Sequence, residues 1–304
     1  MALVKPVHVG IAGWTYEDWH DTVYRIPAPT VQPDLFGATL PGKDRHPADE
    51  LAFIARYVDM IEINSSFYRI PSPRTTELWA RRVAPKSGFF FTAKLHQDFT
   101  HRFLRSRPRA AEFRAALRPL TDHHCLNGVL AQFRYDVQDN GEARGLLEWL
   151  RDEFATLAPL IVEVRHASWQ APPALQFLGS LGVTVANLDY PTSSDSFNPP
   201  VCAIGDQAYF RLHGRNHQAW FSRDADVNDV YNYDYSEAEV GELATRSTAI
   251  LGETKELTIV ANNHYQGKAV SAALRLKARL TGEKQPVPPG LLATYPHLRS
   301  IAAD

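Results

Sequence analysis

Residues 58–95 read VDMIEINSSFYRIPSPRTTELWARRVAPKSGFFFTAKL, and this one segment indicates the architecture of the whole chain. Two short apolar runs, 58–64 and 89–95, flank residues 72–83, whose apolar positions recur at helical spacing. Ser72 ahead of Pro73 supplies an N-cap followed by a first-turn proline. The near-continuous apolar character of both runs is typical of strands buried on both faces, as in a parallel sheet covered by helices. The segment therefore predicts a strand, a helix and a second strand.

The same pattern extends in both directions along the chain. Six more apolar runs predict strands at 7–13, 127–133, 160–165, 183–189, 207–213 and 257–263. Helical spacing recurs at 47–58, 107–120, 142–154, 236–251 and 267–280. Alternating strands and helices predict an α/β domain, and eight repeats favour a closed (β/α)8 barrel of the TIM type. An open doubly wound sheet is the alternative, although no GxGxxG or GxxxxGK[ST] motif follows any strand.

The amino-acid composition limits the number of domains, the kinds of partner and the expected location of the protein. The 304 residues, 44% of them hydrophobic, are enough for a single barrel domain over 1–304, with residues 281–304 as a tail packed on the barrel. Lys and Arg number 32 against 34 Asp and Glu, so the formal charge of -2 provides no global field for nucleic acid or anionic lipid. Two cysteines make neither a disulfide framework nor a thiolate zinc site. Without a secretory signal or a membrane-length apolar run, we expect a cytoplasmic protein that does not enter membranes.

Three connections are unusually long, and each follows a predicted strand: Tyr16 to His46, Tyr190 to Asp206, and Gly214 to Tyr235. In a TIM-type barrel such loops stand over the C-terminal mouth, where function is built. The loop 214–235 carries several aromatic side chains among charged ones, a composition suited to a lid or a partner surface. A self-packed surface loop explains it equally well.

Polar residues gather in the last few positions of the predicted strands. Because side chains alternate between the two faces of a strand, Glu62 and Asn64 point into the barrel if Ile61 and Ile63 face the helices. Charged residues in apolar strands are costly unless they are paired or used, so their common position predicts a functional pocket at the mouth. A buried pair between Glu163 and an arginine, bracing the barrel, is the structural alternative.

Residue chemistry divides this set into two roles. Glu62, Glu163 and His213 are the acid–base candidates, because a partly desolvated cationic pocket can tune their pKa values. Trp14 and Trp169, each just past a strand, are candidates for apolar walls, with core packing as the alternative. The full predicted binding set is Trp14, Asn64, Tyr68, Lys94, Gln132, Arg165, His166, Trp169, Arg211, Asn262 and Asn263.

Several of these motifs together resemble the YecE-like family, also called domain of unknown function 72. The resemblance covers nearly the whole chain and rests on GIAGWTYEDW (10–19), EINSSFYRIPSP (62–73), FTAKLHQDFTH (91–101), VEVRHASW (162–169), YFRLHG (209–214) and ANNHYQGKAVSAALRL (261–276). Ala167 departs from a common proline and Ala261 from a frequent aromatic residue, and neither change removes a polar candidate. The resemblance implies a TIM-type barrel and no established activity, so function has to be argued from the site.

Three functional hypotheses follow. The first is a hydrolase, lyase or isomerase without cofactor, acting on a small anionic or polyhydroxylated substrate, with Lys94, Arg165 and Arg211 forming an anion-binding pocket. The second is a divalent-metal enzyme similar to the xylose-isomerase and endonuclease-IV barrels, with Glu163, Asp189 and His213 as ligands.

The third hypothesis is non-catalytic binding of nucleic acid or protein through the aromatic loop 214–235, with base stacking assisted by Arg215 and Arg223. Four aspartates in the same loop repel phosphate, which makes nucleic acid the less favoured partner.

Overall fold

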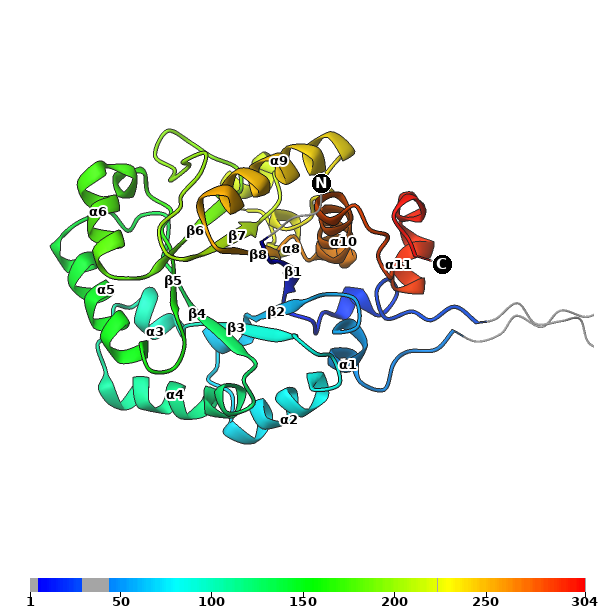
Figure 1. The fold of residues 1–304 in the computed structure, drawn as a ribbon, viewed down its shortest axis with the longest axis horizontal. Helices are drawn as coiled ribbons and strands as arrows, with labels where there is room; N and C mark the ends of the chain where they lie inside the picture. Colours follow the sequence, from blue (N-terminus) through cyan, green and yellow to red (C-terminus); the bar gives the residue numbers. More distant parts are fainter. Residues whose placement is uncertain (1–4, 29–43, 223, 304) are drawn as a thin grey trace, which may run out of the picture.

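The computed structural model describes residues 5–28, 44–222 and 224–303, and its centre is a closed barrel of eight parallel strands in chain order (Figure 1). The strands are β1 (Val7–Ala12), β2 (Met60–Ile63), β3 (Phe90–Lys94), β4 (Leu126–Gln132), β5 (Leu160–Glu163), β6 (Thr184–Asp189), β7 (Gln207–Leu212) and β8 (Glu256–Ala261). β1 pairs with β8 from Val7–Leu257 to Ile11–Ala261, which closes the sheet. The predicted barrel is confirmed, and the open sheet is excluded.

Helices surround the barrel and begin where the sequence supplies caps. Ser72 Oγ accepts from the Thr75 amide at 3.1 Å, and Ser236 and Glu239 form a reciprocal capping box. The helix expected at 47–58 is shorter and covers only Glu50–Ile54. It begins after Asp49, whose side chain accepts from the Ala52 amide as the N-cap. The α-helices are α1 (Glu50–Ile54), α2 (Pro73–Val83), α3 (Gln97–Thr100), α4 (Arg107–Asp122), α5 (Gly141–Phe154), α6 (Pro172–Ser180), α7 (His217–Phe221), α8 (Val227–Val230), α9 (Glu237–Glu253), α10 (Lys268–Thr281) and α11 (Pro289–Thr294). Short 3-10 helices are η1 (Glu17–Trp19), η2 (Ser65–Phe67), η3 (Ala167–Gln170), η4 (Tyr265–Gly267) and η5 (Pro296–Ser300).

The connection between β6 and β7, residues 190–206, contains no helix and so departs from strict alternation. Arg246 of α9 bonds to it instead: its guanidinium donates to the carbonyls of Leu188 at 2.7 Å, Pro200 at 2.9 Å and Pro199 at 3.1 Å. The same group lies 4.8 Å from the ring centroid of Phe210. One side chain thus satisfies backbone oxygens that a regular helix would satisfy internally.

Side-chain alternation divides the buried residues into two clusters. Ile61 and Ile63 belong to the large apolar layer between strands and helices, whereas Met60 lies in a smaller cluster inside the barrel. Glu62 shares the inward face with Met60 and is fully buried. The parity predicted for the second strand is therefore confirmed.

The C-terminal segment after α10 lies against the N-terminal part of the chain. Leu291 and Leu298 are fully buried in the outer apolar layer. A Cβ at Gly290 would come within 2.2 Å of the Thr22 carbonyl oxygen, so the two backbones approach as closely as glycine allows. Throughout the described chain, every helix is too short or too polar to cross a lipid bilayer.

Candidate functional site

An ionic cluster of Glu62, Glu163, Arg165 and Arg211 fills the upper part of the barrel. Arg211, only 1% exposed, donates from Nη2 to Glu62 Oε1 at 2.6 Å, from Nε to Glu62 Oε2 at 3.0 Å, and from Nη1 to Glu163 Oε2. Arg165 donates from Nε to Glu163 Oε1 at 2.7 Å, and the Tyr209 hydroxyl donates to Glu62 Oε2 at 2.9 Å. Two carboxylates and two guanidiniums cancel in charge, so the cluster is internally neutral.

The carboxylate of Glu163 is held in the ionised form by its two arginine partners. Burial alone would raise the pKa of Glu163, but the charges of Arg211 and Arg165 outweigh it and hold that pKa well below the ordinary value. Glu62 and Glu163, predicted as acid–base groups, each already bond to one or two guanidinium groups, which weakens a carboxylate as a proton acceptor. The buried pair between Glu163 and an arginine, considered from the sequence as the structural alternative, is present, because Glu163 bonds to both Arg211 and Arg165.

His213 lies beside the ionic cluster and is completely buried. Burial, and then the positive charge of Arg211, lower its pKa well below the ordinary value, so the ring is neutral. Asn262 Nδ2 lies 3.1 Å from His213 Nδ1, and Arg211 Nη1, which can only donate, lies 3.4 Å from His213 Nε2. Trp220 covers the ring at 5.8 Å between centroids.

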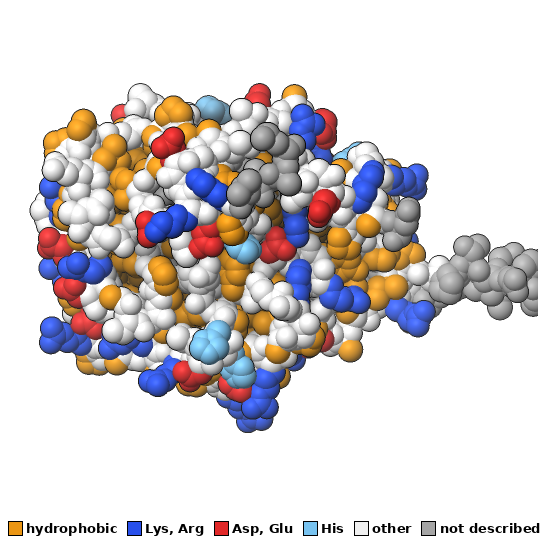
Figure 2. Space-filling view, viewed as in Figure 1, with side chains coloured by type: hydrophobic (Ala, Val, Ile, Leu, Met, Phe, Trp, Pro, Cys, Tyr) orange, Lys and Arg blue, Asp and Glu red, His pale blue; other side chains and the backbone are white. Residues whose placement is uncertain are grey.

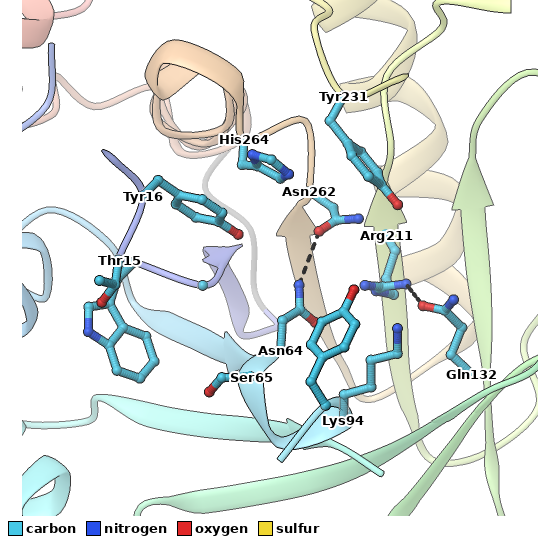
Figure 3. Close-up of a pocket in the computed structure, with 13 residues that line it drawn as sticks. Thr15, Tyr16, Asn64, Ser65, Lys94, Gln132, Arg211, Tyr231, Asn262 and His264 are labelled. Carbon is cyan, nitrogen blue, oxygen red and sulfur yellow. Dashed lines mark hydrogen bonds between the residues drawn. The ribbon is translucent and has the colours of Figure 1, made fainter. Parts of the chain in front are cut away.

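A cavity of about 400 Å³ opens above the cluster, at the C-terminal ends of the strands (Figure 3). We call it the lysine pocket. It contains seven of the predicted binding residues together with residues that the prediction omitted. Its lining is Gly13, Trp14, Thr15, Tyr16, Asn64, Ser65, Tyr68, Lys94, Gln132, Arg211, Tyr231, Asn262 and His264.

Lys94, at the end of β3, extends into this pocket between Asn64 and Gln132 (Figure 3). Its Nζ lies 4.0 Å from the ring centroid of Phe67 and forms no ion pair or hydrogen bond within the described residues. Burial lowers the pKa of Lys94 to about 7, and the Arg211 charge acts in the same direction. A substantial fraction of the amine is therefore neutral at physiological pH.

Two polar atoms of residues that line the pocket have no hydrogen-bond partner in the described chain. Asn64 donates from Nδ2 to Asn262 Oδ1 at 3.3 Å, but its own Oδ1 is buried without a partner in the described chain. The same holds for His264 Nδ1. His264 stacks on Tyr16 with centroids 4.3 Å apart, and burial lowers its pKa to about 4, so it is neutral. Buried polar atoms are rarely left without a partner, so these two call for a bonding group from outside the described chain.

A second cavity of about 770 Å³ lies next to the first, beneath the aromatic loop 214–235. Arg165 and His166, both predicted binding residues, line this second cavity, and the Arg165 guanidinium lies 5.5 Å from the Trp220 ring centroid. Tyr231 lines both cavities and so forms part of the wall between them. The predicted binding residues are thus divided between two adjacent spaces.

The aromatic loop is tied to the barrel at both ends. Tyr235 donates to Asp189 Oδ2 at 2.7 Å and accepts from the Gly214 amide at 3.0 Å, and Arg215 Nη2 donates to Asp189 Oδ1 at 2.9 Å. Gly214 has a φ of 85°, and a Cβ there would lie 2.7 Å from Tyr233 Cβ, so the expected close approach does occur. Arg223 of this loop and residues 29–43 of the first long connection lie outside the described residues.

Two predicted binding residues lie outside both cavities. Trp169 is fully buried in the outer apolar layer and donates to the Val137 carbonyl at 2.9 Å, so core packing is its role. Asn263 shares the outward face of its strand with Ala261, and its Nδ2 donates to the Tyr233 carbonyl at 2.8 Å. Both expectations are corrected, because each side chain points away from the barrel interior.

The three residues considered as metal ligands are not brought together. Asp189 points outward and bonds to Arg215 and Tyr235, while Glu163 and His213 point inward. Within the described chain, no three His, Cys, Asp or Glu side chains form a group that could hold a metal ion. The donor set proposed from sequence therefore does not fit a divalent cation.

The prediction omitted several polar or aromatic residues that line the lysine pocket from the neighbouring loops. Tyr16 and His264 follow the first and last strands, so position in a barrel was the signal available for them. Ser65 directly follows Asn64, and Tyr231 comes from the aromatic loop. A loop position such as that of Tyr231 has no periodicity from which it could be inferred.

The distribution of charged side chains on the face drawn in Figure 2 does not favour binding of a polyanion. Acidic and basic side chains alternate there without an extended basic patch. The formal charge of -2 agrees with this distribution. A nucleic acid needs a continuous basic track, which this face does not provide.

Comparisons with known proteins agree with the fold and the motifs. A family model described as "Protein of unknown function DUF72" matches residues 8–296. The UPF0759 protein YunF of Bacillus subtilis (strain 168) is 25% identical over 278 residues, which cover 86% of this chain and 90% of YunF.

Two crystal structures of DUF72 family proteins are also similar. One, from Thermotoga maritima MSB8, is 27% identical with a TM-score of 0.71, covering 90% of this chain and 99% of that chain. Another, from Enterococcus faecalis V583, is 21% identical with a TM-score of 0.73, covering 93% and 98%, and bears on the fold alone. From the match over residues 8–296, this chain belongs to the DUF72 family.

Proposed function

We propose that this protein is an enzyme that performs non-redox acid–base chemistry on a small polyhydroxylated molecule in the lysine pocket. The observation that carries the proposal is the amine of Lys94, which has no polar partner in the described chain and faces a cavity with unfilled hydrogen-bonding atoms. An amine that titrates near pH 7 can both accept and return a proton under physiological conditions.

Hydroxyl groups suit this pocket better than several acid groups. The guanidiniums of Arg165 and Arg211, expected to bind an anion, already bond to Glu62 and Glu163. Asn64 Oδ1 needs a donor, which a hydroxyl supplies and a carboxylate does not. One acid group on the ligand is compatible with the single free cation of the described pocket, so polyols, sugars and hydroxy acids are the substrate class.

Each group of the pocket then has a role. Lys94 takes a proton from the substrate, and the phenols of Tyr68 and Tyr231, which line the same space, are the proton donors. Burial raises the pKa of Tyr68, which keeps its hydroxyl protonated at neutral pH. The ionic cluster below fixes the floor of the pocket and contributes no net charge.

Ligand-induced thermal stabilisation tests the proposal. Polyols, sugars, hydroxy acids and sugar phosphates are screened against the wild type, because a ligand that binds only the folded state raises the melting temperature. We expect stabilisation by hydroxylated compounds that is lost in Asn64→Ala. Asn263→Ala, which alters an asparagine outside the pocket, is the matched control and should keep the response. The proposal fails if no compound stabilises the wild type, or if both variants respond alike.

A further inference from the structure

Lys94 differs from the other lysines of the described chain in having no oxygen partner. The six others each donate to a carbonyl, amide or carboxylate oxygen: Lys5, Lys86, Lys255, Lys268, Lys277 and Lys284. Lys94 Nζ instead lies over the Phe67 ring and opens to the pocket. A lysine amine without partners, facing a cavity, is the arrangement of an activated nucleophile.

The backbone that carries this amine is fixed. The hydroxyl of Ser66, fully buried, has one proton and lies 2.6 Å from the Lys94 carbonyl oxygen and 2.9 Å from the Ile63 carbonyl oxygen, so this shared hydrogen bond ties the end of β3 to the end of β2. Phe67 is the next residue along the chain, and its ring centroid lies 4.0 Å from the Nζ of Lys94. The nucleophile is therefore held by two strand ends rather than by a mobile loop.

The thiols of the chain do not compete for this role. Cys125 and Cys202 are both buried, and burial raises the pKa of each to about 11. A thiol with so high a pKa is almost entirely protonated at neutral pH and is a poor nucleophile.

We infer that Lys94 condenses with the carbonyl carbon of an open-chain hydroxyaldehyde or hydroxyketone to form an imine. This inference rests on the proposed function, since it uses the same pocket and narrows the substrate class to compounds with a carbonyl group next to hydroxyl groups. The hydroxyl groups bond to Asn64 Oδ1 and His264 Nδ1, the two atoms left open in the wall.

The reaction balances without an oxidant or a reductant. The neutral amine forms a C–N bond as the carbonyl π pair moves to oxygen, which takes up a proton while the nitrogen releases one. The resulting hydroxyl leaves as water after a further proton transfer, for which the Tyr231 phenol in the pocket wall is the donor. The nitrogen lone pair then completes the C=N bond of a protonated imine, and Tyr231 is left as the phenolate that takes the proton back when the imine becomes neutral, so the net change is the loss of one water.

The surroundings also suit the charge of the protonated imine. That charge lies where the ammonium now lies, 4.0 Å from the Phe67 ring centroid. Attraction between a cation and an aromatic face favours the charge at this position. The repulsion from Arg211 in the cluster beneath is opposed by the charges of Glu163 and Glu62.

Reductive trapping tests the inference on the wild-type protein. Glyceraldehyde or dihydroxyacetone is added at pH 7 with cyanoborohydride, which reduces an imine to a stable secondary amine, and the modified lysine is found by peptide mass spectrometry. We expect a single saturable adduct on Lys94, formed at least about tenfold faster than on Lys255, because far more of the Lys94 amine is neutral at this pH. Lys255, whose side chain is 75% exposed, is the internal control.

Two variants complete the experiment. Lys94→Arg keeps a cation but removes the primary amine, and it should lose the adduct; Lys86→Arg should keep it. Labelling of Lys94 no faster than Lys255 overturns the inference. If thermal stabilisation by polyols persists while trapping fails, the imine is wrong and the proposed function stands; if both fail, both are wrong.

Discussion

Arg211 determines more of this site than any other single residue. Its guanidinium bonds to Glu62, to Glu163 and, at 3.0 Å, to Gln132 Oε1, so most of its N–H donors are already engaged within the protein. Burying ions in this way is costly, and removing one partner leaves an unpaired charge in the barrel. Arg211 therefore braces the two carboxylates, and Lys94 is the pocket cation without a polar partner among the described residues.

Replacing Arg211 should destabilise the barrel severely. Arg211→Met leaves two buried carboxylates without their main partner and should lower the free energy of unfolding by about 3–5 kcal/mol. Arg165→Met should cost clearly less, because Glu163 keeps its bond to Arg211 and Arg165 is more exposed. Urea unfolding followed by circular dichroism measures both. Equal losses in the two variants would contradict the central role of Arg211.

Individual elements are held in place by long-range contacts rather than by their own hydrogen bonds. The helix-free connection 190–206 depends on Arg246 of α9, and the aromatic loop depends on Asp189 at the end of β6. In both cases a charged group of one element anchors a segment from another part of the chain. Such segments are expected to open more easily than the strands.

Removing Arg246 should loosen the connection 190–206. Arg246→Ala deletes three charge-assisted hydrogen bonds to carbonyls, and we expect a loss of about 1.5–3 kcal/mol in unfolding free energy with faster proteolysis within 190–206. Thr245→Ala, at an exposed position of the same helix, should have little effect. A proteolysis pattern unchanged from the wild type would show that the connection holds without Arg246.

Asp189 should control the opening of the aromatic loop. Asp189→Asn removes the charge that holds Arg215, so amide hydrogen exchange across 214–235 should accelerate by at least about tenfold, while the strands keep their protection. Asp206→Asn breaks an exposed ion pair with Lys255 and is the matched control. If exchange in the loop is the same in both variants, other contacts anchor it.

At the scale of the molecule, one core lies between strands and helices and a second lies inside the barrel, with the polar layer above the second. Titration of that polar layer acts on the stability of the whole fold. The pKa of Lys94 is lowered by folding, so the unfolded state binds more protons than the folded state between about pH 7 and the ordinary lysine pKa near 10.4. Stability therefore rises with pH through this window.

Lys94→Met should remove that rise. The difference in unfolding free energy between the wild type and Lys94→Met should shift in favour of the wild type from pH 6 to pH 9.5, with a slope of at most about 1.4 kcal/mol per pH unit. Urea unfolding at pH 6, 8 and 9.5 measures it. A constant difference across the three values would mean that the pKa of Lys94 is ordinary.

The sequence predicted the barrel and the inward face of its strands because both depend on local periodicity. Glu62 and Asn64 illustrate this, since alternation with Ile61 and Ile63 placed them correctly. The same parity argument, applied to Asp189 and Asn263, would have placed both on the outward face of their strands. It therefore corrects the predictions that Asp189 binds a metal and that Asn263 binds a ligand in the barrel. Alternation was thus a sufficient signal for these two residues as well.

Pairing across the barrel could not be predicted in this way. Glu62 and Arg211 are 149 positions apart, and no local pattern states that one saturates the other. The sequence therefore suggested an anion-binding arginine where the fold uses a brace. Trp169 lies just past its strand, but whether it turns outward or inward depends on η3, which periodicity does not describe.

Because the ionic cluster is internally neutral, the protonation state of Lys94 determines the net charge of the lysine pocket. That charge determines which ligands the pocket attracts. Below pH 7 the ammonium of Lys94 is uncompensated and draws anions; above pH 7 the same atom is an uncharged electron-pair donor with no pull on them. Anion affinity and nucleophilic reactivity therefore trade off along a single titration curve. By thermodynamic reciprocity, a bound anion raises the pKa of Lys94 and suppresses its reactivity. Buffers rich in phosphate should accordingly act as inhibitors of any chemistry that needs the free amine.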